Sequence, residues 1–195
     1  MDKEMISFSL DGQPVSAFAG EPILEVAKRH GVDIPHLCFK AGYRADGNCR
    51  ACVVEVEGER VLAPSCCRAP TAGMQVVTQS PRVQTSQRMV LEMLLADLPD
   101  AGFKWTDGDV TAPSPTPPSG ETDTIGQHGE LSEWATRLGV TARPALQAIR
   151  RESVAADVSH PAIAVNLDAC IQCNRCVRAC REEQVNDVIG MAFRG

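Results

Sequence analysis

The sequence has few aromatic residues, no excess of positive charge and no long apolar run. Its 195 residues include 5 Phe, 2 Trp and 1 Tyr, and the formal net charge at pH 7 is −6. Nucleic-acid-binding domains generally present a basic face, so the charge gives no support to a nucleic-acid partner. No stretch of 18 apolar residues occurs, and we therefore expect no membrane-spanning helix and no membrane partner.

We also expect no secretory signal peptide. The first residues, MDKEMISFSLDGQ, mix both signs of charge and turn after a short apolar alternation. We therefore expect a cytoplasmic protein, in which thiols stay reduced. The 9 cysteines then indicate metal ligands rather than disulfides, and the odd number and the adjacent pair Cys66-Cys67 favour the same interpretation.

The first group of cysteines has the spacing C-x10-C-x2-C-x13-C, starting at Cys38. Its middle pair, Cys49 and Cys52, lies on a tight loop in which Gly47 can adopt a positive φ and backbone N–H groups can turn toward sulfur. The loop runs into an alternating, β-branched segment, residues 51–57, which we expect to form a strand. Such a loop can cradle an anionic iron–sulfur core. A four-cysteine zinc site is the alternative that the C-x2-C pair leaves open.

The long first gap and the GNCRAC loop resemble the N-terminal [2Fe-2S] domain of respiratory NADH dehydrogenase large subunits, iron-only hydrogenases and NAD-dependent formate dehydrogenases. Plant-type ferredoxins share the close pair but have four residues in the first gap. In the related domains a Ser-Cys step carries the fourth ligand, so Cys67 is interpreted as a thiol near the cluster. His36 is interpreted as structural, because four cysteines already suffice. The resemblance implies that one [2Fe-2S] cluster is bound by Cys38, Cys49, Cys52 and Cys66.

The second group of cysteines has the spacing C-x2-C-x2-C-x3-C of bacterial [4Fe-4S] ferredoxins. Three thiols at steps of three suit three corners of one cube, and the fourth ligates a neighbouring cluster in two-cluster proteins. Zinc is again the alternative, although zinc sites favour two separated pairs. We therefore predict one [4Fe-4S] cluster on Cys170, Cys173 and Cys176, and a second [4Fe-4S] cluster on Cys180.

Three arginines surround this second motif, at positions 175, 178 and 181, and Arg181 replaces the usual proline after the fourth cysteine. They can raise a cluster potential through positive charge, or offset the acidic pair Glu182-Glu183. No second motif of this spacing follows before Gly195. We therefore expect a fragment of a longer polypeptide, in which this motif alone gives a labile or three-iron species.

The first 80 residues have the pattern of a β-grasp fold. A hairpin is expected over residues 5–18 with its turn at Asp11-Gly12, and a helix with one apolar face is expected over residues 23–30. Further strands are expected at residues 61–63 and 74–78. A unit of about 80 residues is near the size at which a small core benefits from a bound metal.

The following part is predicted to be mainly helical and irregular. Residues 85–97 form an amphipathic pattern with Met89 and Met93 expected in the core, and the proline-rich residues 98–127 lack periodicity, which predicts a linker. We expect short helices at 131–138 and 144–151 and a strand at 162–167. The predicted class is α+β, with a [2Fe-2S] ferredoxin-like β-grasp domain at 1–82, a helix, linker and short helices at 83–160, and a partial [4Fe-4S] ferredoxin-type domain at 161–195.

Taken together, the GNCRAC loop, the later SC step, the helix RMVLEMLLAD and the segment AVNLDACIQCNRCVRACREEQVNDVIGMA are similar to one family in particular. This family is the large (alpha) subunit of soluble, molybdenum-dependent, NAD-reducing formate dehydrogenase. The NADH dehydrogenase large subunit and the diaphorase subunit of NAD-linked hydrogenases would continue after the helix with a His-x3-Cys-x2-Cys cluster motif. Here that place has LADLPDAGFKW, with neither His nor Cys.

The resemblance implies that the chain is the electron-transfer region of an enzyme that converts formate and NAD+ to CO2 and NADH. A molybdenum bis-pterin guanine dinucleotide in the remainder of the same polypeptide would oxidise formate, and single electrons would pass to a flavin/NAD-binding subunit, with a small iron–sulfur subunit as a further partner. This stretch itself would hold no catalytic residue. Two alternatives stay open: an iron–sulfur subunit of a diaphorase, NADH-quinone oxidoreductase or NAD-linked hydrogenase, and a non-redox iron–sulfur sensor.

Overall fold

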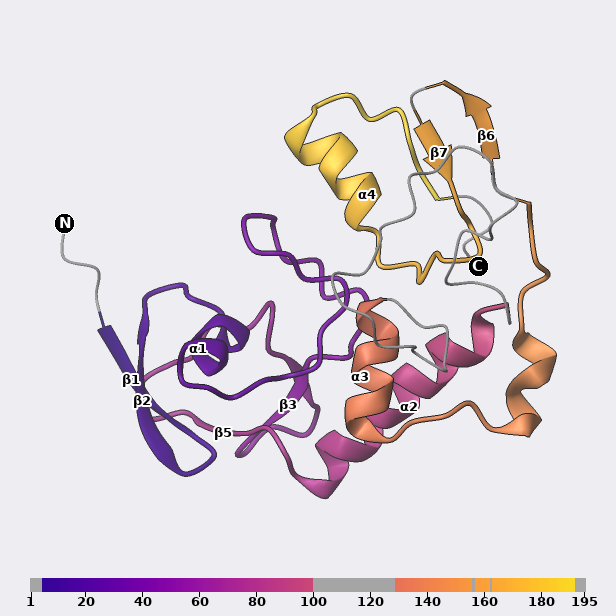
Figure 1. Ribbon diagram of the computed structural model, residues 1–195. Coiled ribbons are helices and arrows are strands. Elements are labelled where there is room, and N and C mark those ends of the chain that lie inside the picture. Colours follow the sequence, from indigo (N-terminus) through magenta and orange to yellow (C-terminus); the bar gives the residue numbers. More distant parts are fainter. Residues whose placement is uncertain (1–4, 100–128, 156, 162, 192–195) are drawn as a thin grey trace, which may run out of the picture. The chain divides into compact units, whose positions relative to one another are not determined.

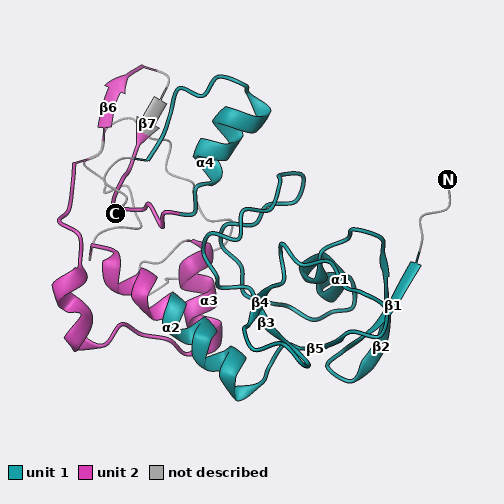
Figure 2. Ribbon diagram, turned by 180° about the vertical axis from the view of Figure 1, so that it is seen from behind, with its two compact units in different colours: residues 1–90, 173–195 teal, residues 91–172 magenta. Residues whose placement is uncertain are grey.

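The structure is a computed structural model that describes residues 5–99, 129–155, 157–161 and 163–191 (Figure 1). The chain divides into two compact units (Figure 2). Unit 1 comprises residues 1–90 and 173–195, and unit 2 comprises residues 91–172. None of the described helices is long and apolar enough to cross a membrane.

Unit 1 is built on a mixed five-stranded sheet in the order β2-β1-β5-β3-β4. The hairpin β1–β2 is antiparallel, β5 lies parallel to β1, and β3 pairs antiparallel with both β5 and β4. The strands are β1 (Met5–Leu10), β2 (Gln13–Phe18), β3 (Val53–Val56), β4 (Ala63–Pro64) and β5 (Gln75–Val77). The predicted hairpin and the strands expected within residues 51–57 and 74–78 are thereby confirmed, whereas β4 coincides with the strand expected at 61–63 only at Ala63.

The hairpin follows from alternation and from its turn. Phe8 and Leu10 of β1 and Val15 and Ala17 of β2 are buried, so one face of the hairpin enters the core. The turn residues Asp11 and Gly12 have φ of 50° and 81°. Two positive φ values in sequence match the twist of an antiparallel ribbon, which explains why Asp-Gly occupies this position.

Helix α1 (Ile23–Arg29) covers this face of the sheet. Pro22 is extended and caps its N-terminus, and Gly31, with φ of 76°, follows the C-cap residue His30. A glycine at that position is the usual helix terminator, because it adopts a left-handed φ without strain. The buried residues Ile23, Leu24, Val26 and Ala27 join the hairpin and β3 in one hydrophobic core.

Helix α2 (Pro81–Asp97) begins four residues earlier than expected. Ser80 accepts a hydrogen bond from the backbone N–H of Val83, and Pro81 suits a first helical position. Val83, Gln87 and Leu91, spaced by four residues, form its buried side. The expectation that Met89 and Met93 lie in the core is wrong, because their exposed fractions are 52% and 53%.

Unit 2 contains α3 (Glu130–Leu138), the 3₁₀ helix η1 (Pro144–Ile149) and a two-stranded antiparallel sheet. The strands are β6 (Asp157–His160) and β7 (Ile163–Val165). Both predicted helices are present, although the second has 3₁₀ geometry, and β6 was not expected. Nearly all of the predicted linker lies outside the described residues.

The second cysteine motif ends in a short helical segment of unit 1. Helix α4 (Arg175–Arg178) passes directly into one π-helical turn, η2 (Ala179–Glu183). The compact units follow spatial contacts, so the predicted domain boundaries at residues 82 and 160 stay a prediction. The mixed α+β architecture with a ferredoxin-like sheet agrees with the predicted class.

Candidate metal centres

The structure brings four sulfur atoms together in unit 1. The Cys38 side chain is hydrogen-bonded to Cys49 and to Cys66, and the Cys52 side chain is hydrogen-bonded to Cys66. Cys38, Cys52 and Cys66 are at most 1% exposed, and Cys49 is half-buried. These are the four residues that the sequence assigns to one cluster, and they come from segments up to 28 positions apart.

The loop that carries Cys49 turns its backbone toward sulfur, as the sequence indicates. Gly47 and Arg50 adopt left-handed conformations with φ of 62° and 59°. The backbone N–H groups of Asn48 and Cys49 donate to the Cys38 sulfur, and the N–H of Ala51 donates to the Cys49 sulfur. N–H groups aimed at sulfur favour thiolates and lower the energy of an anionic cluster.

Cys66 is held from two sides by its neighbour Ser65. The Ser65 side chain is fully buried and donates to the Cys52 carbonyl over 2.7 Å, and the Ser65 N–H donates to the same carbonyl over 3.1 Å. The Ser65 carbonyl accepts the N–H of Leu24 over 3.0 Å, and the Arg68 carbonyl accepts that of Ile23 over 2.8 Å. The first turn of α1 therefore fixes the segment that carries Cys66.

Contacts among the four thiols lower the pKa of two of them and raise the pKa of the other two. Hydrogen bonds from Cys49 and Cys66 lower the pKa of the Cys38 thiol to about 2, and a hydrogen bond from Cys66 lowers the pKa of the Cys52 thiol to about 7. The pKa values of Cys49 and Cys66 are raised, first because their protons are shared with Cys38 and then because of burial and neighbouring negative charge. The lowered pKa of Cys38 favours the thiolate, which is the form that ligates metals.

Cys67 lies beside this group on its exposed side. Its sulfur is 3.5 Å from the Cys66 sulfur, and a Cβ added to Gly47 would lie 3.0 Å from it. Gly47 therefore lacks a side chain where the Cys67 sulfur packs over the loop. His36 bonds through Nδ1 to the Ile34 carbonyl over 2.8 Å, which is consistent with the structural role expected for it.

The donor set fits an iron–sulfur cluster. Side-chain hydrogen bonds link the four cysteines through Cys38 and Cys66, two of the thiols have a lowered pKa, and backbone N–H groups already point at sulfur. In the described part of the chain, no three His, Cys, Asp or Glu side chains are arranged to hold one metal ion. A two-iron cluster distributes its four thiolates over two iron atoms, so they need not converge on a single point.

The second motif is more open. Cys170 and Cys173 are half-buried, Cys176 is exposed and Cys180 is buried. The backbone N–H of Gln172 points to the Cys170 sulfur and that of Val188 to the Cys180 sulfur, each over 3.4 Å. Cys170 belongs to unit 2 and the other three cysteines to unit 1. Their assignment to [4Fe-4S] clusters stays a prediction from spacing.

Polar contacts within unit 2 hold the segment that leads to Cys170. Arg151 donates to the Cys170 carbonyl over 2.6 Å and pairs with the carboxylate of Asp97 over 2.8 Å. Asp168, which is 7% exposed, accepts hydrogen bonds from the Ser153 hydroxyl and the Val154 N–H. These bonds, and the charge of Arg151, lower the pKa of the Asp168 carboxyl. The segment depends on carbonyl and carboxylate contacts more than on apolar packing.

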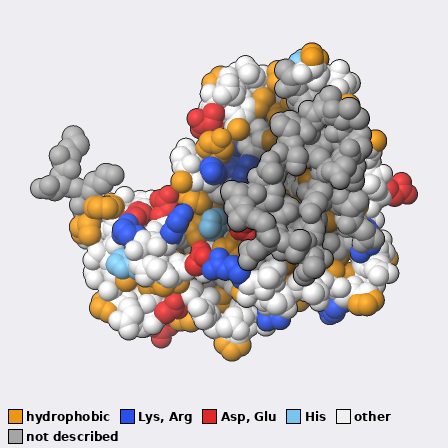
Figure 3. Space-filling view, in the orientation of Figure 1, with side chains coloured by type: hydrophobic (Ala, Val, Ile, Leu, Met, Phe, Trp, Pro, Cys, Tyr) orange, Lys and Arg blue, Asp and Glu red, His pale blue; other side chains and the backbone are white. Residues whose placement is uncertain are grey.

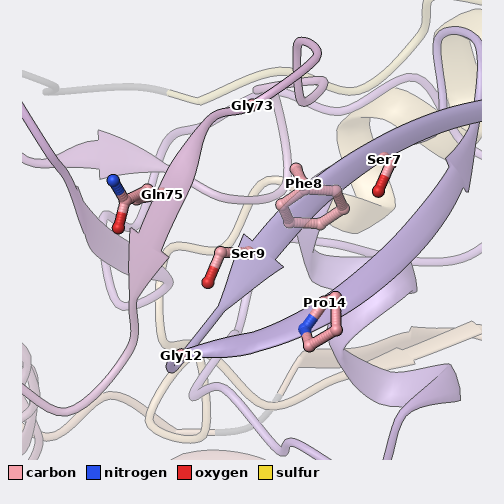
Figure 4. Close-up of a pocket in the computed structure, with 7 residues that line it drawn as sticks. All are labelled: Ser7, Phe8, Ser9, Gly12, Pro14, Gly73 and Gln75. Carbon is pink, nitrogen blue, oxygen red and sulfur yellow. The ribbon is translucent and has the colours of Figure 1, made fainter.

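Two other surface features carry little chemistry. The pocket drawn in Figure 4 lies between β1, the start of β2 and the approach to β5, and is lined by residues such as Ser7, Ser9 and Gln75, with no titratable side chain. On the face seen in Figure 3, basic and acidic side chains of the described residues are interspersed. The cysteine groups are therefore the candidate sites that the structure favours.

Sequence reasoning missed several residues that shape the first site. The sequence pattern identifies Ser65 only as part of the SC step. It gives no role to Gln87, whose amide donates to the Val53 carbonyl over 3.0 Å. The sequence indicates only a charge near the second motif for Arg178, whereas in the structure its side chain donates to the Cys38 carbonyl. Gln87 could have been identified because it is a polar residue on the otherwise apolar side of its helix.

Comparison with known proteins places these observations in a family context. Residues 3–81 match the family described as 2Fe-2S iron-sulfur cluster binding domain. The chain is 36% identical over 98% of its length to the NADP-reducing hydrogenase subunit HndD of Solidesulfovibrio fructosivorans, of which it covers 30%. It is 30% identical over 97% of its length to the mitochondrial 78 kDa subunit of NADH-ubiquinone oxidoreductase from Candida albicans, of which it covers 24%.

One solved structure is similar to the chain over nearly its whole length. The chain is similar to a chain of an NAD+-reducing [NiFe]-hydrogenase crystallised in the H2-reduced state, with a TM-score of 0.70 and 26% identity. The match covers 97% of this chain and 71% of that one. The chain spans less than one third of the length of each of the two curated relatives.

Proposed function

We propose that this chain, whose residues 3–81 match a 2Fe-2S iron-sulfur cluster binding domain, is the electron-transfer part of an NAD-linked oxidoreductase complex. The observation that carries the proposal is the gathering of Cys38, Cys49, Cys52 and Cys66 within the matched domain. Similarity to hydrogenase and NADH-ubiquinone oxidoreductase subunits over nearly the whole chain supports the kind of complex.

In this proposal the four cysteines are the ligands of one [2Fe-2S] cluster. When bound, such a cluster takes up and releases one electron at a time, which suits a relay between two-electron reactions. The chain's own contribution is to preform the sulfur set, to direct N–H groups of the loop at residues 46–52 to it and to exclude water by burial. No residue here is assigned a catalytic role.

We extend the proposal to the second motif on its spacing. Cys170, Cys173 and Cys176 would hold a [4Fe-4S] cluster, and Cys180 would ligate a second one. A relay of this kind requires a neighbouring flavin- and NAD-binding subunit to receive or supply electrons, and a small iron–sulfur subunit is the further partner implied by the resemblance. The remainder of a longer polypeptide would supply the substrate site.

The comparisons favour a hydrogenase or NADH-dehydrogenase type of complex over formate dehydrogenase, because the relatives described above carry those names. Formate dehydrogenase, with its molybdenum bis-pterin guanine dinucleotide, remains a second candidate for one reason. The segment LADLPDAGFKW has neither His nor Cys where the resemblance leads us to expect a further cluster motif in the first two types.

Two measurements test these proposals. Iron and acid-labile sulfide analysis of the anaerobically purified chain, with EPR after dithionite reduction, should give a [2Fe-2S] signal. Stoichiometric zinc without sulfide would overturn the proposal. Metal analysis of the native complex, purified through this chain, then separates the types of enzyme. Nickel with iron would indicate a [NiFe]-hydrogenase, and iron alone an NADH dehydrogenase or iron-only hydrogenase. Molybdenum would indicate a formate dehydrogenase.

A further inference from the structure

Arg178 lies inside the second cysteine motif but its side chain contacts the first. Its two terminal nitrogens donate to the carbonyl oxygens of Cys38 and Arg44, which are 140 and 134 positions away in the chain. The guanidinium carbon is 6.0 Å from the centre of the Tyr43 ring. Arg178 is 3% exposed, so these contacts are buried inside the protein.

Neighbouring residues bind the same segment. Arg175 donates to the Phe39 carbonyl over 2.8 Å, and Arg44 pairs with Glu182 over 3.0 Å. The loop from Cys38 to Arg44 is therefore contacted at both ends by residues that flank Cys176 and Cys180. These contacts all lie within unit 1.

The charge of Arg178 has no carboxylate partner in the described part of the chain. Its acceptors are two neutral carbonyls, and its Nε, although buried, has no hydrogen-bond partner among the described residues. A buried cation without a counter-ion is costly. The four-thiolate site that begins at Cys38 is anionic when loaded and would offset that cost.

We propose that Arg178 is a positioning residue for the first cluster: it fixes the Cys38–Arg44 segment and raises the reduction potential of the [2Fe-2S] centre by its charge. The inference rests on the proposed function for the loaded state. A reduced cluster carries one more negative charge than an oxidised one, so a nearby buried cation stabilises the reduced form. The second motif thereby contributes directly to the environment of the first.

The test uses three variants of the purified chain. Arg178→Gln removes the charge, and Arg178→Lys keeps the charge but cannot contact both carbonyls. Arg181→Gln is the control: it removes an exposed arginine that directly follows the motif and pairs with Asp187. The readouts are the midpoint potential of the [2Fe-2S] EPR signal and the hydrogen-exchange rate of the amides at residues 38–44.

Arg178→Gln should lower the potential by about 59 mV, which is a tenfold change in the ratio of oxidised to reduced cluster for one electron. Arg178→Lys should keep most of the potential but speed amide exchange, because one ammonium group cannot replace a guanidinium that spans two carbonyls. Arg181→Gln should change neither quantity. Arg178→Gln with an unchanged potential would overturn the charge role, and unchanged exchange in both Arg178 variants would overturn the positioning role.

The outcome is separable from the proposed function. If the parent chain binds no [2Fe-2S] cluster, the proposed function fails and with it the effect on potential. Hydrogen exchange in the metal-free chain then still decides whether Arg178 positions the segment, because its contacts are with backbone carbonyls that need no metal.

Discussion

The two cysteine groups differ in how far the fold prepares each of them. In the first, three of the four sulfurs are almost completely buried and each bonds to another sulfur of the set. In the second, Cys176 is exposed and Cys170 and Cys173 are half-buried, beside Gln172 and Asn174 in left-handed conformations. A spacing pattern therefore identifies candidate ligands in both groups but does not reveal how far either site is preformed.

The physical reason lies in where the ligands come from. Those of the first group lie in loops and turns that are far apart in the sequence and that join elements of one hydrophobic core, so folding alone gathers the sulfurs. Those of the second group lie within 11 consecutive residues, which a bound metal cluster can organise by itself. We expect the first site to depend on the fold and the second to depend on its metal.

The largest expected effect concerns the fourth ligand of the first group. Cys66→Ser should abolish the EPR signal of the reduced [2Fe-2S] cluster, because the buried segment held by Ser65 cannot move another sulfur into place. Cys67→Ser is the matched control and should leave the signal, since Cys67 lies on the exposed side. If Cys67→Ser abolished the signal and Cys66→Ser left it, Cys67 and not Cys66 would be the fourth ligand.

The second prediction tests the dependence of the second group on its metal. The chain expressed alone should assemble its [2Fe-2S] centre but give a labile or three-iron species at the second motif, as followed by EPR during exposure to air or a chelator. A stable [4Fe-4S] cluster that disappears in the Cys180→Ala variant would contradict this and remove the contrast between the two sites.

The third prediction measures how tightly the first site is packed. Gly47→Ala should destabilise the chain by about 1–2 kcal/mol for its positive φ, and by about 1 kcal/mol more through the contact with Cys67. Gly58→Ala is the matched control, because Gly58 has φ of 81° and nothing within 4 Å of the added Cβ. Urea unfolding measures how much more stability Gly47→Ala loses than Gly58→Ala. This excess loss should be smaller in a Gly47→Ala/Cys67→Ala double variant. Equal losses of stability in Gly47→Ala and Gly58→Ala would show that the contact with Cys67 costs nothing.

The smallest expected effect is on the ionic contacts of unit 2. Arg143 bonds to Glu92 over 2.5 Å and lowers the pKa of the Glu92 carboxyl. The stability from this pair is present above the unfolded-state pKa of Glu92 and is lost as the pH falls through the lowered folded-state pKa. The unfolding free energy of Glu92→Gln should therefore differ from that of the parent at neutral pH and match it in acid, and a difference that persists in acid would indicate another cause.

The hairpin, α1, α3, β3 and β5 could be predicted from the sequence because their patterns are local. The start of α2 was predicted too late, because the capping role of Ser80 depends on a single hydroxyl group. Met89 and Met93 were expected in the core, but the buried face of the helix is the one that carries Gln87 and the residues four positions before and after it. The gathering of the four cysteines in unit 1 was expected from spacing and resemblance. The contacts of Ser65 and Arg178 were not predictable, since they join residues whose proximity only the tertiary fold determines.

The two hydrogen bonds that the first turn of α1 makes to the segment around Cys66 also have a consequence for cooperativity. The N–H groups of Ile23 and Leu24 would otherwise be exposed at a helix end, and their acceptors belong to the segment that carries a ligand. Fraying of α1 and displacement of Cys66 are therefore one event. The site and the hydrophobic core should open together as a single foldon, so partial unfolding that spares the core while releasing a metal at this site is disfavoured.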